Sequence, residues 1–496
     1  MSLVEEASRD ASPSRARERR EQLATQLPRI VEGLIDELSA ESEQQRRRLT
    51  VLRRSDIARE SHTAIAADVG LSRSQFYRDL HEARELLSDA LENRFSPAGV
   101  QRDSSDPRFL AIEALRSGGR FDRARALAST LARHADAREA IRALCLRAEV
   151  ELELGTFAAA SSSVEHARRA IPHVVDEGSR RLFAARCDLL ECEAAHGGGQ
   201  PWPEARRNAA LEARRRDYRA GDSRAAVILA KALVEEASLR FERADDAALP
   251  TIEEALTVVE DARVDDVRLL IDVRVRSSGI RALRAQHTKA ALDEAQQIVA
   301  FAERSGDVRG LRAGTQMVAG HLLTLDRLEE AKRFALDALY LVDIFGSSLD
   351  RVIVLSNLAR IDVHRRDGAA ALRWIRAARA IPSDAFTIVQ ALAITEIEAL
   401  VLLARAPQAM ARARGLEPRV RAWSRLTGRL KLAQAVALEA LGAANEARRA
   451  SAEAVEHATA QGSPLLRRRA LELDVKLSGN SASRRTLREL QAALSA

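Results

Sequence analysis

Residues 73 to 84 carry a run of polar and basic side chains whose types suit recognition of nucleic acid. Arginine can make two parallel hydrogen bonds to guanine and glutamine can do so to adenine, so we expect Arg73, Gln75 and Arg78 to read base edges. Hydroxyl groups and further cations can donate to phosphate oxygens. The residues expected to do this, or to flank the readers on the same face, are Ser74, Tyr77, His81, Arg84, Arg46, Arg47, Arg48, Arg53 and Arg54. Together these side chains predict a site for double-stranded DNA.

The charge of this region favours DNA only modestly. Between residues 44 and 84 there are nine arginines and five acidic residues, which gives a local charge of +4. Across the first hundred residues, Asp and Glu slightly outnumber Arg. The prediction of DNA binding therefore depends on the pattern of residue types and not on charge alone.

A short helix, a glycine turn and a second helix are predicted to position these side chains. Residues 64 to 69 form the first helix, and Gly70 permits the sharp turn that follows it. Ser72 and Gln75 form a capping pair that satisfies two backbone amides, so the second helix should begin at about Arg73. Its expected buried stripe is Phe76, Leu80, Ala83 and Leu87. This pattern is typical of a helix-turn-helix DNA reader, and the alternative is an ordinary helical hairpin with a solvated polar face.

The overall composition predicts an all-α protein. The chain has 496 residues, only 3% of them aromatic, and the abundant Ala, Leu, Arg and Glu favour helix. The net charge is +6, from 78 basic and 72 acidic residues. There is no apolar run of about eighteen residues and no signal peptide, so we expect a cytoplasmic protein that does not enter a membrane. No catalytic cluster, cofactor motif or metal-ligand spacing stands out, and an enzyme is not expected.

The three cysteines are Cys145, Cys187 and Cys192. Three thiols do not make a disulfide framework, and no histidine pair joins them at the spacing of a metal site. We therefore expect buried free thiols.

From residue 108 to residue 478 a helical hairpin is repeated with a period near 40. A small residue opens the second helix of each unit, and we place it at Ala124, Ala160, Ala205, Ala248, Ala291, Ala331, Ala371, Ala409 and Ala447. Each hairpin has one apolar stripe that it cannot bury alone, so neighbouring hairpins should stack into a superhelix with a concave face. The sequence therefore predicts a right-handed α-solenoid of about nine hairpins.

These copies resemble the tetratricopeptide repeat, in which a Gly-x-Tyr/Phe turn is followed by alanine three residues after the aromatic and often by a closing proline. The best match consists of Gly155, Phe157, Ala160, Val164, Ala167 and Pro172. Concave faces of such arrays bind peptides, protein segments or another copy of the array. The candidate contact residues on the first helices are Arg142, Arg186, Arg274, Arg281, Gln316, Asn357 and Arg360.

The predicted order along the chain is a disordered polar tail (1–20), a helix-turn-helix domain (21–94), a linker (95–107), the repeat array (108–478) and a capping helix (479–496). Residues 64 to 91 resemble the fourth-region helix-turn-helix of bacterial sigma factors and of response-regulator output domains. The combination with tetratricopeptide repeats is similar in layout to bacterial one-component regulators, notably the peptide-sensing ones.

The leading hypothesis is a transcriptional regulator. Its N-terminal domain would read a DNA site, and its array would sense a peptide or protein partner or hold a homodimer. The alternative is a tetratricopeptide scaffold with a helical docking module and no DNA binding.

Overall fold

The computed structural model describes residues 35–36, 38–40, 42–58, 60–95, 107–117, 119–134, 136–200, 202–220, 223–261, 267–282, 288–305 and 308–495. All regular structure in these ranges is helical. They divide into two compact units, one within residues 1–127 and 301–308 and the other within 128–300 and 309–496. The predicted tail and most of the predicted linker lie outside the described residues. Within the described ranges, no helix combines the length and apolarity that crossing a bilayer requires.

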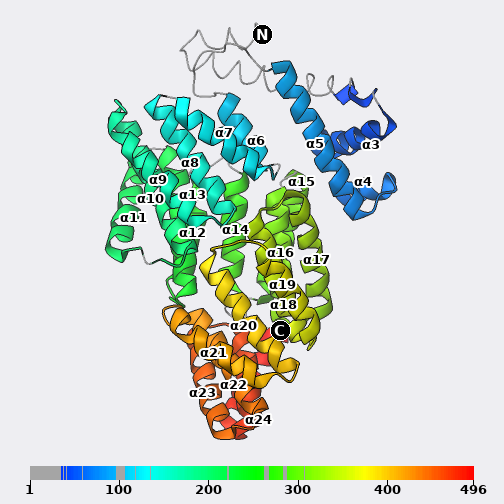
Figure 1. Cartoon of the computed structure of the whole chain (residues 1–496), viewed down its shortest axis with the longest axis vertical. Helices are drawn as coiled ribbons and strands as arrows, with labels where there is room; N and C mark the ends of the chain where they lie inside the picture. Colours follow the sequence, from blue (N-terminus) through cyan, green and yellow to red (C-terminus); the bar gives the residue numbers. More distant parts are fainter. Residues whose placement is uncertain are drawn as a thin grey trace. The chain divides into compact units, whose positions relative to one another are not determined.

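The first unit begins with helical segments that pack against one another, drawn in blue in Figure 1. They are α3 (Glu43–Leu52), the π-helix η1 (Arg53–Ile57), α4 (His62–Asp68) and α5 (Arg73–Phe95). The hydroxyls of Ser42 and Ser61 cap α3 and α4. Leu49, Ile65 and Phe76 are fully buried, so each helix contributes to the core. Helices α6 (Pro107–Ser117) and α7 (Phe121–His134) follow.

The second unit is a succession of antiparallel helix pairs. Its helices are α8 (Ala137–Glu153), α9 (Phe157–Ala170), η2 (Ile171–His173), α10 (Glu177–Gly197), α11 (Glu204–Arg219), α12 (Ser223–Glu242), α13 (Ala248–Asp261), α14 (Val267–Arg281), α15 (Thr288–Ser305), α16 (Val308–Thr324), α17 (Leu328–Phe345), α18 (Ser348–His364), α19 (Gly368–Arg379), α20 (Phe386–Leu402), α21 (Ala406–Val420), α22 (Ser424–Ala440), α23 (Ala444–Ala460), α24 (Pro464–Ser478) and α25 (Ser481–Ser495). The helix predicted as a cap over 479–496 is α25, which forms one more hairpin with α24 through Leu471, Leu490 and Leu494.

A small buried residue marks the crossing of the two helices in most hairpins. The fourth residue of the second helix is an almost fully buried alanine at Ala124, Ala160, Ala291, Ala331, Ala371, Ala409 and Ala447. Ala205 was predicted to do the same and does not, because it is exposed. Arg207 takes the fourth position of α11 and is buried against Glu236, with Nε 2.5 Å from Oε2. Ala248 is buried, but it is the first residue of α13.

Each described turn inside a hairpin contains one residue in the left-handed conformation. These residues are Gly119, Gly155, Gly199, Ala244, Asp326, Arg366, Ala404, Gly442 and Gly479. Glycine enters this conformation without steric cost, whereas other residues are strained by their Cβ atom. The recurrence of one backbone step shows that the hairpins repeat in structure even where the sequence signature is weak.

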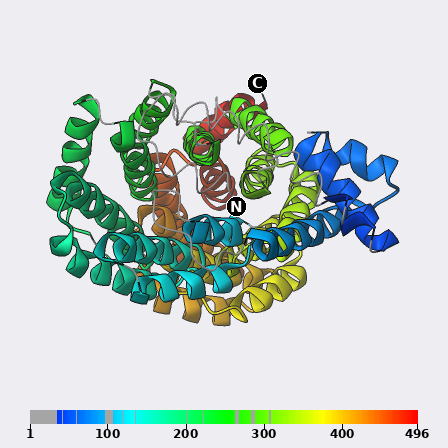
Figure 2. The same ribbon diagram turned by 90° about the horizontal axis from the view of Figure 1, so that it is seen from above.

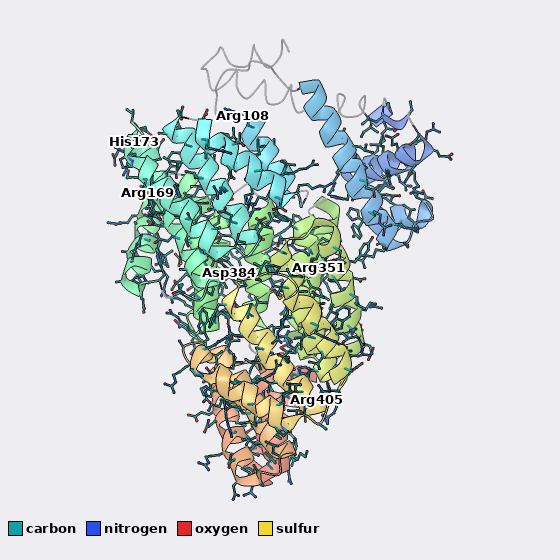
Figure 3. The ribbon with its side chains drawn as sticks, viewed as in Figure 1. Arg108, Arg169, His173, Arg351, Asp384 and Arg405 are labelled. Carbon is teal, nitrogen blue, oxygen red and sulfur yellow. The ribbon has the colours of Figure 1, made fainter. Side chains whose placement is uncertain are left out.

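Distant hairpins of the second unit also contact each other. The Ser348 hydroxyl at the start of α18 donates to the carbonyl of Leu154 at 2.9 Å, across 194 positions of the chain. Asp384 Oδ1 accepts from the amide of Phe157 at 3.3 Å (Figure 3). Figure 2 shows that the hairpins follow a curved path, and these bonds join its separate parts. Local stacking sets the curvature, and contacts between distant hairpins hold it.

We expect Gly155→Ala to lower the thermal midpoint and Ala404→Gly to raise it or leave it unchanged. Gly155 has a φ of +74°, and an added Cβ would lie 3.2 Å from Leu349 Cβ. Strain of this kind costs about 1–2 kcal/mol in a residue other than glycine. Ala404 already carries that strain at a φ of 59°, and its removal is partly offset by the entropy of glycine. Calorimetry of both variants measures the two shifts, and destabilisation by both would contradict this assignment.

His321 on α16 is held by a hydroxyl from the preceding first helix. Ser278 Oγ lies 2.9 Å from the carbonyl oxygen of Ala291 and 3.0 Å from His321 Nε2. A hydroxyl has one proton and the carbonyl can only accept it, so the imidazole donates through Nε2–H. Burial lowers the pKa of His321 to about 4. The ring is therefore neutral at pH 7.

We expect the burial of His321 to make the protein sensitive to acid. The histidine pKa is about 6.5 in an unfolded chain, so between that pH and about 4 the unfolded state binds more protons than the folded state. The free energy of unfolding should fall as pH drops through this window, by up to about 3 kcal/mol. Denaturation midpoints from pH 7 to pH 4 measure the slope. His321→Gln should flatten it, and an unchanged slope would assign the acid sensitivity to other groups.

Candidate functional site

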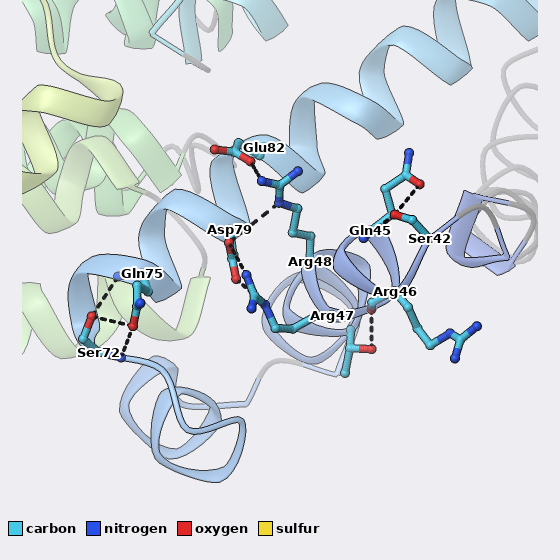
Figure 4. Close-up of polar contacts among 10 residues, drawn as sticks. Ser42, Gln45, Arg46, Arg47, Arg48, Ser72, Gln75, Asp79 and Glu82 are labelled. Carbon is cyan, nitrogen blue, oxygen red and sulfur yellow. Dashed lines mark hydrogen bonds and ion pairs between the residues drawn. The ribbon is translucent and has the colours of Figure 1, made fainter.

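Hydrogen bonds fix the start of α5 after the turn. Gly70 has a φ of +71°, the left-handed conformation expected for the turn. Gln75 Oε1 accepts from the Ser72 amide at 3.1 Å and from the Ser72 hydroxyl at 3.0 Å, while the Gln75 amide donates to Ser72 Oγ at 3.2 Å (Figure 4). Helix α5 begins at Arg73. The predicted capping pair and the predicted helix start are both confirmed.

Aromatic residues of α5 are anchored in the core. Phe76 and Tyr77 are each only 1% exposed. The Tyr77 hydroxyl lies 3.4 Å from His62 Nδ1, and Ser55 Oγ lies 3.0 Å from the Nε2 of the same ring. The prediction that Tyr77 contacts phosphate is therefore wrong, because its hydroxyl faces a buried polar cluster. Its position directly after Phe76 places it beside the apolar stripe and on the same side of the helix.

Arg47 and Arg48 join α3 to α5 through carboxylates (Figure 4). Arg47 donates to both oxygens of Asp79, with distances of 2.9 Å from Nε and 3.3 Å from Nη2. Arg48 pairs with Asp79 and with Glu82. The Asp79 side chain is only 6% exposed, so its charge depends on these cations. Both arginines were predicted to bind phosphate, and the structure instead assigns them to holding α3 on α5.

Arg53 and Arg54 are engaged in the same way. Arg53 pairs with Asp36. Arg54 lies 2.6 Å from a Glu60 oxygen and 2.5 Å from an Asp68 oxygen, so it bridges two carboxylates at the two ends of α4. The hydrogen bonds that Arg54 donates to these carboxylates raise its pKa above the usual range. The positive charge expected from the upstream arginines is thus largely compensated within the fold.

The predicted residues around the start of α5 differ in exposure. Exposed are Arg46, Arg73, Gln75 and Arg78, and half-buried are Ser74, His81 and Arg84. The oxygen of Gln75 is occupied by the cap, so a two-bond contact to adenine would require the cap to open. Burial, with the charges of Arg120 and Arg84, lowers the pKa of His81 to about 4, so this ring is not a cation at pH 7. Arg73 and Arg78 remain as exposed cations on the first two turns of α5.

The sequence pattern does not predict the role of Asp79 in this site. It lies three residues after Phe76, which puts it on the buried side of α5. A buried carboxylate needs a cation, and the arginine run at 46–48 supplies it. Which of those arginines reaches it depends on how α3 packs on α5, and this is visible only in three dimensions.

The predicted contact residues of the array differ in exposure and in ion pairing. Arg186 lies 2.6 Å from Glu149, and Arg281 lies within 3.9 Å of two carboxylates. Half-buried on first helices are Arg142, Arg274, Gln316 and Asn357. Arg360 on α18 differs, because its Nε is buried and has no hydrogen-bond partner among the described residues.

The three cysteines are buried free thiols, as predicted. Within the described part of the chain, no group of three or more His, Cys, Asp or Glu side chains is arranged to hold a metal ion.

Comparison with solved structures identifies the architecture. A Rap protein complexed with competence and sporulation factor superposes with a TM-score of 0.53 at 12% identity, covering 72% of this chain and 99% of that chain. The Rap conjugation gene regulator of the plasmid pLS20, in complex with a Phr peptide, gives 0.46 at 11% identity, covering 71% and 94%. The APC/C hetero-tetramer Cut9-Hcn1 gives 0.35 at 12% identity, covering 86% and 92%.

No family model and no curated protein matches the sequence. At these identities the likeness concerns the fold alone. It shows that the chain has an all-α fold of stacked, tetratricopeptide-like helical hairpins, similar to the Rap protein over 72% of its length.

We expect Asp79→Asn to loosen α3 and α5. The change leaves two guanidinium groups without their shared carboxylate, at a cost of roughly 2–3 kcal/mol. Hydrogen exchange of the full chain should show this as faster opening of α3 and α5 amides. Asp122→Asn is the control, because that carboxylate is exposed and pairs with Arg125 one turn away on the same helix. Equal effects of both changes would contradict the role given to Asp79.

Proposed function

We propose that the protein is a DNA-binding transcriptional regulator in which α4, the turn and α5 act as a helix-turn-helix. The observation that carries this proposal is the position of Arg73 and Arg78. Both are exposed on the first two turns of a helix whose start is capped and whose other face is anchored through Tyr77 and Asp79. A helix that enters the major groove meets base edges with such N-terminal residues, and arginine pairs bidentately with guanine.

The ion pairs of the first unit bear on affinity. Each phosphate that a protein neutralises adds to binding and to its dependence on salt. Arg47, Arg48, Arg53 and Arg54 are paired with carboxylates, so few cations are left for phosphates. One copy of the chain should therefore bind DNA weakly. Two copies joined as a homodimer would make the second half-site contact intramolecular and raise the affinity.

The array is proposed to sense a peptide or protein partner. Support comes from its likeness in fold to a Rap protein that was solved in complex with competence and sporulation factor. Stacked hairpins also provide an extended inner surface that a peptide can follow. A scaffold without DNA binding remains the alternative, and the experiment below separates the two.

We expect selection from randomised duplex DNA with the full chain to enrich one motif. The Arg73→Ala/Arg78→Ala variant should lose that enrichment, because each bidentate arginine–guanine contact is worth about 1–3 kcal/mol. Its circular dichroism should be unchanged, since both side chains are exposed. Arg373→Ala/Arg376→Ala removes the same charge from the exposed side of α19 and should leave enrichment intact.

The outcomes separate the hypotheses. A motif that the Arg73/Arg78 variant still enriches would remove α5 from the recognition site. The absence of any motif, together with an absence of DNA affinity at low as well as at high salt, would favour a scaffold.

A further inference from the structure

Four arginines gather on three first helices near the C-terminal end of the second unit. Arg360 lies on α18, Arg425 and Arg429 on α22, and Arg469 on α24. Helices α18, α20, α22 and α24 contact one another in turn, so these residues share one lining of the array. Arg429 contacts Thr395 and Arg469 contacts Glu398, two residues less than one turn apart on α20. Besides burial, the charges of Arg429, Arg425 and Arg469 also lower the pKa of Arg360. We call these four residues the basic cluster.

The basic cluster has too few carboxylates for its charge. Arg469 Nη1 lies 2.6 Å from Glu398 Oε1, which makes the one close ion pair. Arg425 Nε is 4.0 Å from a Glu242 oxygen, at the outer limit of such contacts. Arg429 donates to the Thr395 hydroxyl at 3.2 Å and not to a carboxylate.

Two guanidinium atoms of the basic cluster are left without a bond. Arg360 Nε and Arg425 Nη1 are buried and have no hydrogen-bond partner among the described residues. A buried donor without a partner costs about 1–3 kcal/mol, and more when it is charged. Buried guanidinium nitrogens without a hydrogen bond also occur at Arg207 and Arg312. Those arginines, however, each have a carboxylate within 2.5 Å, Glu236 and Asp350. The imbalance at the basic cluster is therefore local.

The pKa values of Arg360, Arg425 and Arg429 are lowered by burial and by the charges of neighbouring arginines. Burial, followed by the charges of Arg429 and Arg425, lowers the pKa of Arg360 to about 9. Burial also lowers the pKa of Arg425 and of Arg429. His364, one turn beyond Arg360, has its pKa lowered well below the usual value by burial and by Arg469. These arginines stay charged at pH 7, so an anion placed among them would remove a repulsion that the protein alone does not relieve.

An apolar cavity lies between the end of α10, the end of α12 and the two residues that precede α22, close to Arg425 of the basic cluster. The Arg425 guanidinium sits 3.8 Å from the centre of the Phe241 ring at the end of α12. The neighbouring cavity has a volume of about 160 Å³ and is lined by Cys192, His196, Gly199, Gln200, Trp202, Leu239, Arg243, Ala422 and Trp423. A cavity of roughly 150 Å³ holds one benzene molecule, so this cavity has room for a single apolar side chain.

We propose that the basic cluster binds the carboxylates of an acidic peptide, with an apolar side chain of that peptide in the adjoining cavity. This rests on the proposed role of the array as a ligand sensor and specifies the chemistry of the ligand. Guanidinium groups match carboxylates in geometry and charge. A small inorganic anion could satisfy the cations but would leave the cavity empty, whereas a peptide with both residue types satisfies both parts.

The test uses the full chain and a fluorescein-labelled peptide of sequence Glu-Glu-Phe-Glu-Glu, read by fluorescence anisotropy. Three comparison ligands separate the contributions: Gln-Gln-Phe-Gln-Gln lacks the charge, Glu-Glu-Gly-Glu-Glu lacks the apolar side chain, and pyrophosphate is a small anion used as a competitor. We expect at least tenfold tighter binding of the first peptide than of either comparison peptide.

Variants locate the site. Arg360→Gln/Arg429→Gln should weaken binding at least tenfold, while Arg373→Gln/Arg376→Gln on the exposed side of α19 removes the same charge and should not. Thermal denaturation of each variant without ligand shows whether a loss of binding is caused by misfolding. Arg360→Gln alone should raise the thermal midpoint because it removes a repelling cation, whereas a structural arginine would lower it when replaced.

The remaining outcomes overturn the proposal. Equal binding by both double variants would mean nonspecific attraction to a basic protein, and binding of pyrophosphate without peptide binding would mean a small-anion site. A lowered midpoint for Arg360→Gln, or no binding of the acidic peptide, would make the basic cluster structural. If the full chain recognises DNA through Arg73 but does not bind the acidic peptide, this inference is wrong and the proposed DNA binding is unaffected. If it binds the acidic peptide but recognises no DNA motif, the proposed DNA binding is wrong and the ligand site is unaffected.

Discussion

The close approach of two helices at each hairpin crossing is the constraint on which the array depends. Interiors are close-packed, so the fourth residue of the second helix must be small for the crossing to form. Ala160, Ala331 and Ala409 meet this requirement with no exposed surface. In α11 this position is held by a large buried residue, Arg207, and a buried carboxylate of α12 accompanies it. One geometric requirement thus sets both the repeat period and the place where a buried ion pair becomes necessary.

The first unit solves a different problem, because its short helices have little apolar surface to share. Asp79 answers it by accepting hydrogen bonds from α3 while lying on the buried side of α5. The cap formed by Ser72 and Gln75 fixes the other end of the same helix segment. Rigid presentation of Arg73 and Arg78 follows from these two features, and the arginines that perform the holding are lost to any ligand.

Local signals of the sequence were sufficient for local structure. The Ser72–Gln75 cap and the turn at Gly70 depend on residues a few positions apart, and both are as predicted. The buried alanines are as predicted at seven of the nine positions, the exceptions being Ala205 and Ala248. Tyr77 and the upstream arginines were misassigned because exposure and ion pairing depend on how separate helices pack. The same limit applies to the basic cluster, of which only Arg360 was among the candidates, since its members come from three separate helices, α18, α22 and α24.

A ligand can change a protein only through a difference in affinity between two states. The contact of Arg425 on α22 with Phe241 on α12 joins two helices that lie far apart along the chain. An acidic peptide that bridges these helices would therefore bind the present curvature of the array better than a more open one, and each tenfold difference in affinity would shift the balance by about 1.4 kcal/mol. Arg425 Nη1, which has no hydrogen-bond partner among the described residues, makes that contact costly without a ligand. The excess of positive charge at the basic cluster destabilises the fold, and the same excess would let a bound anion stabilise one curvature of the array.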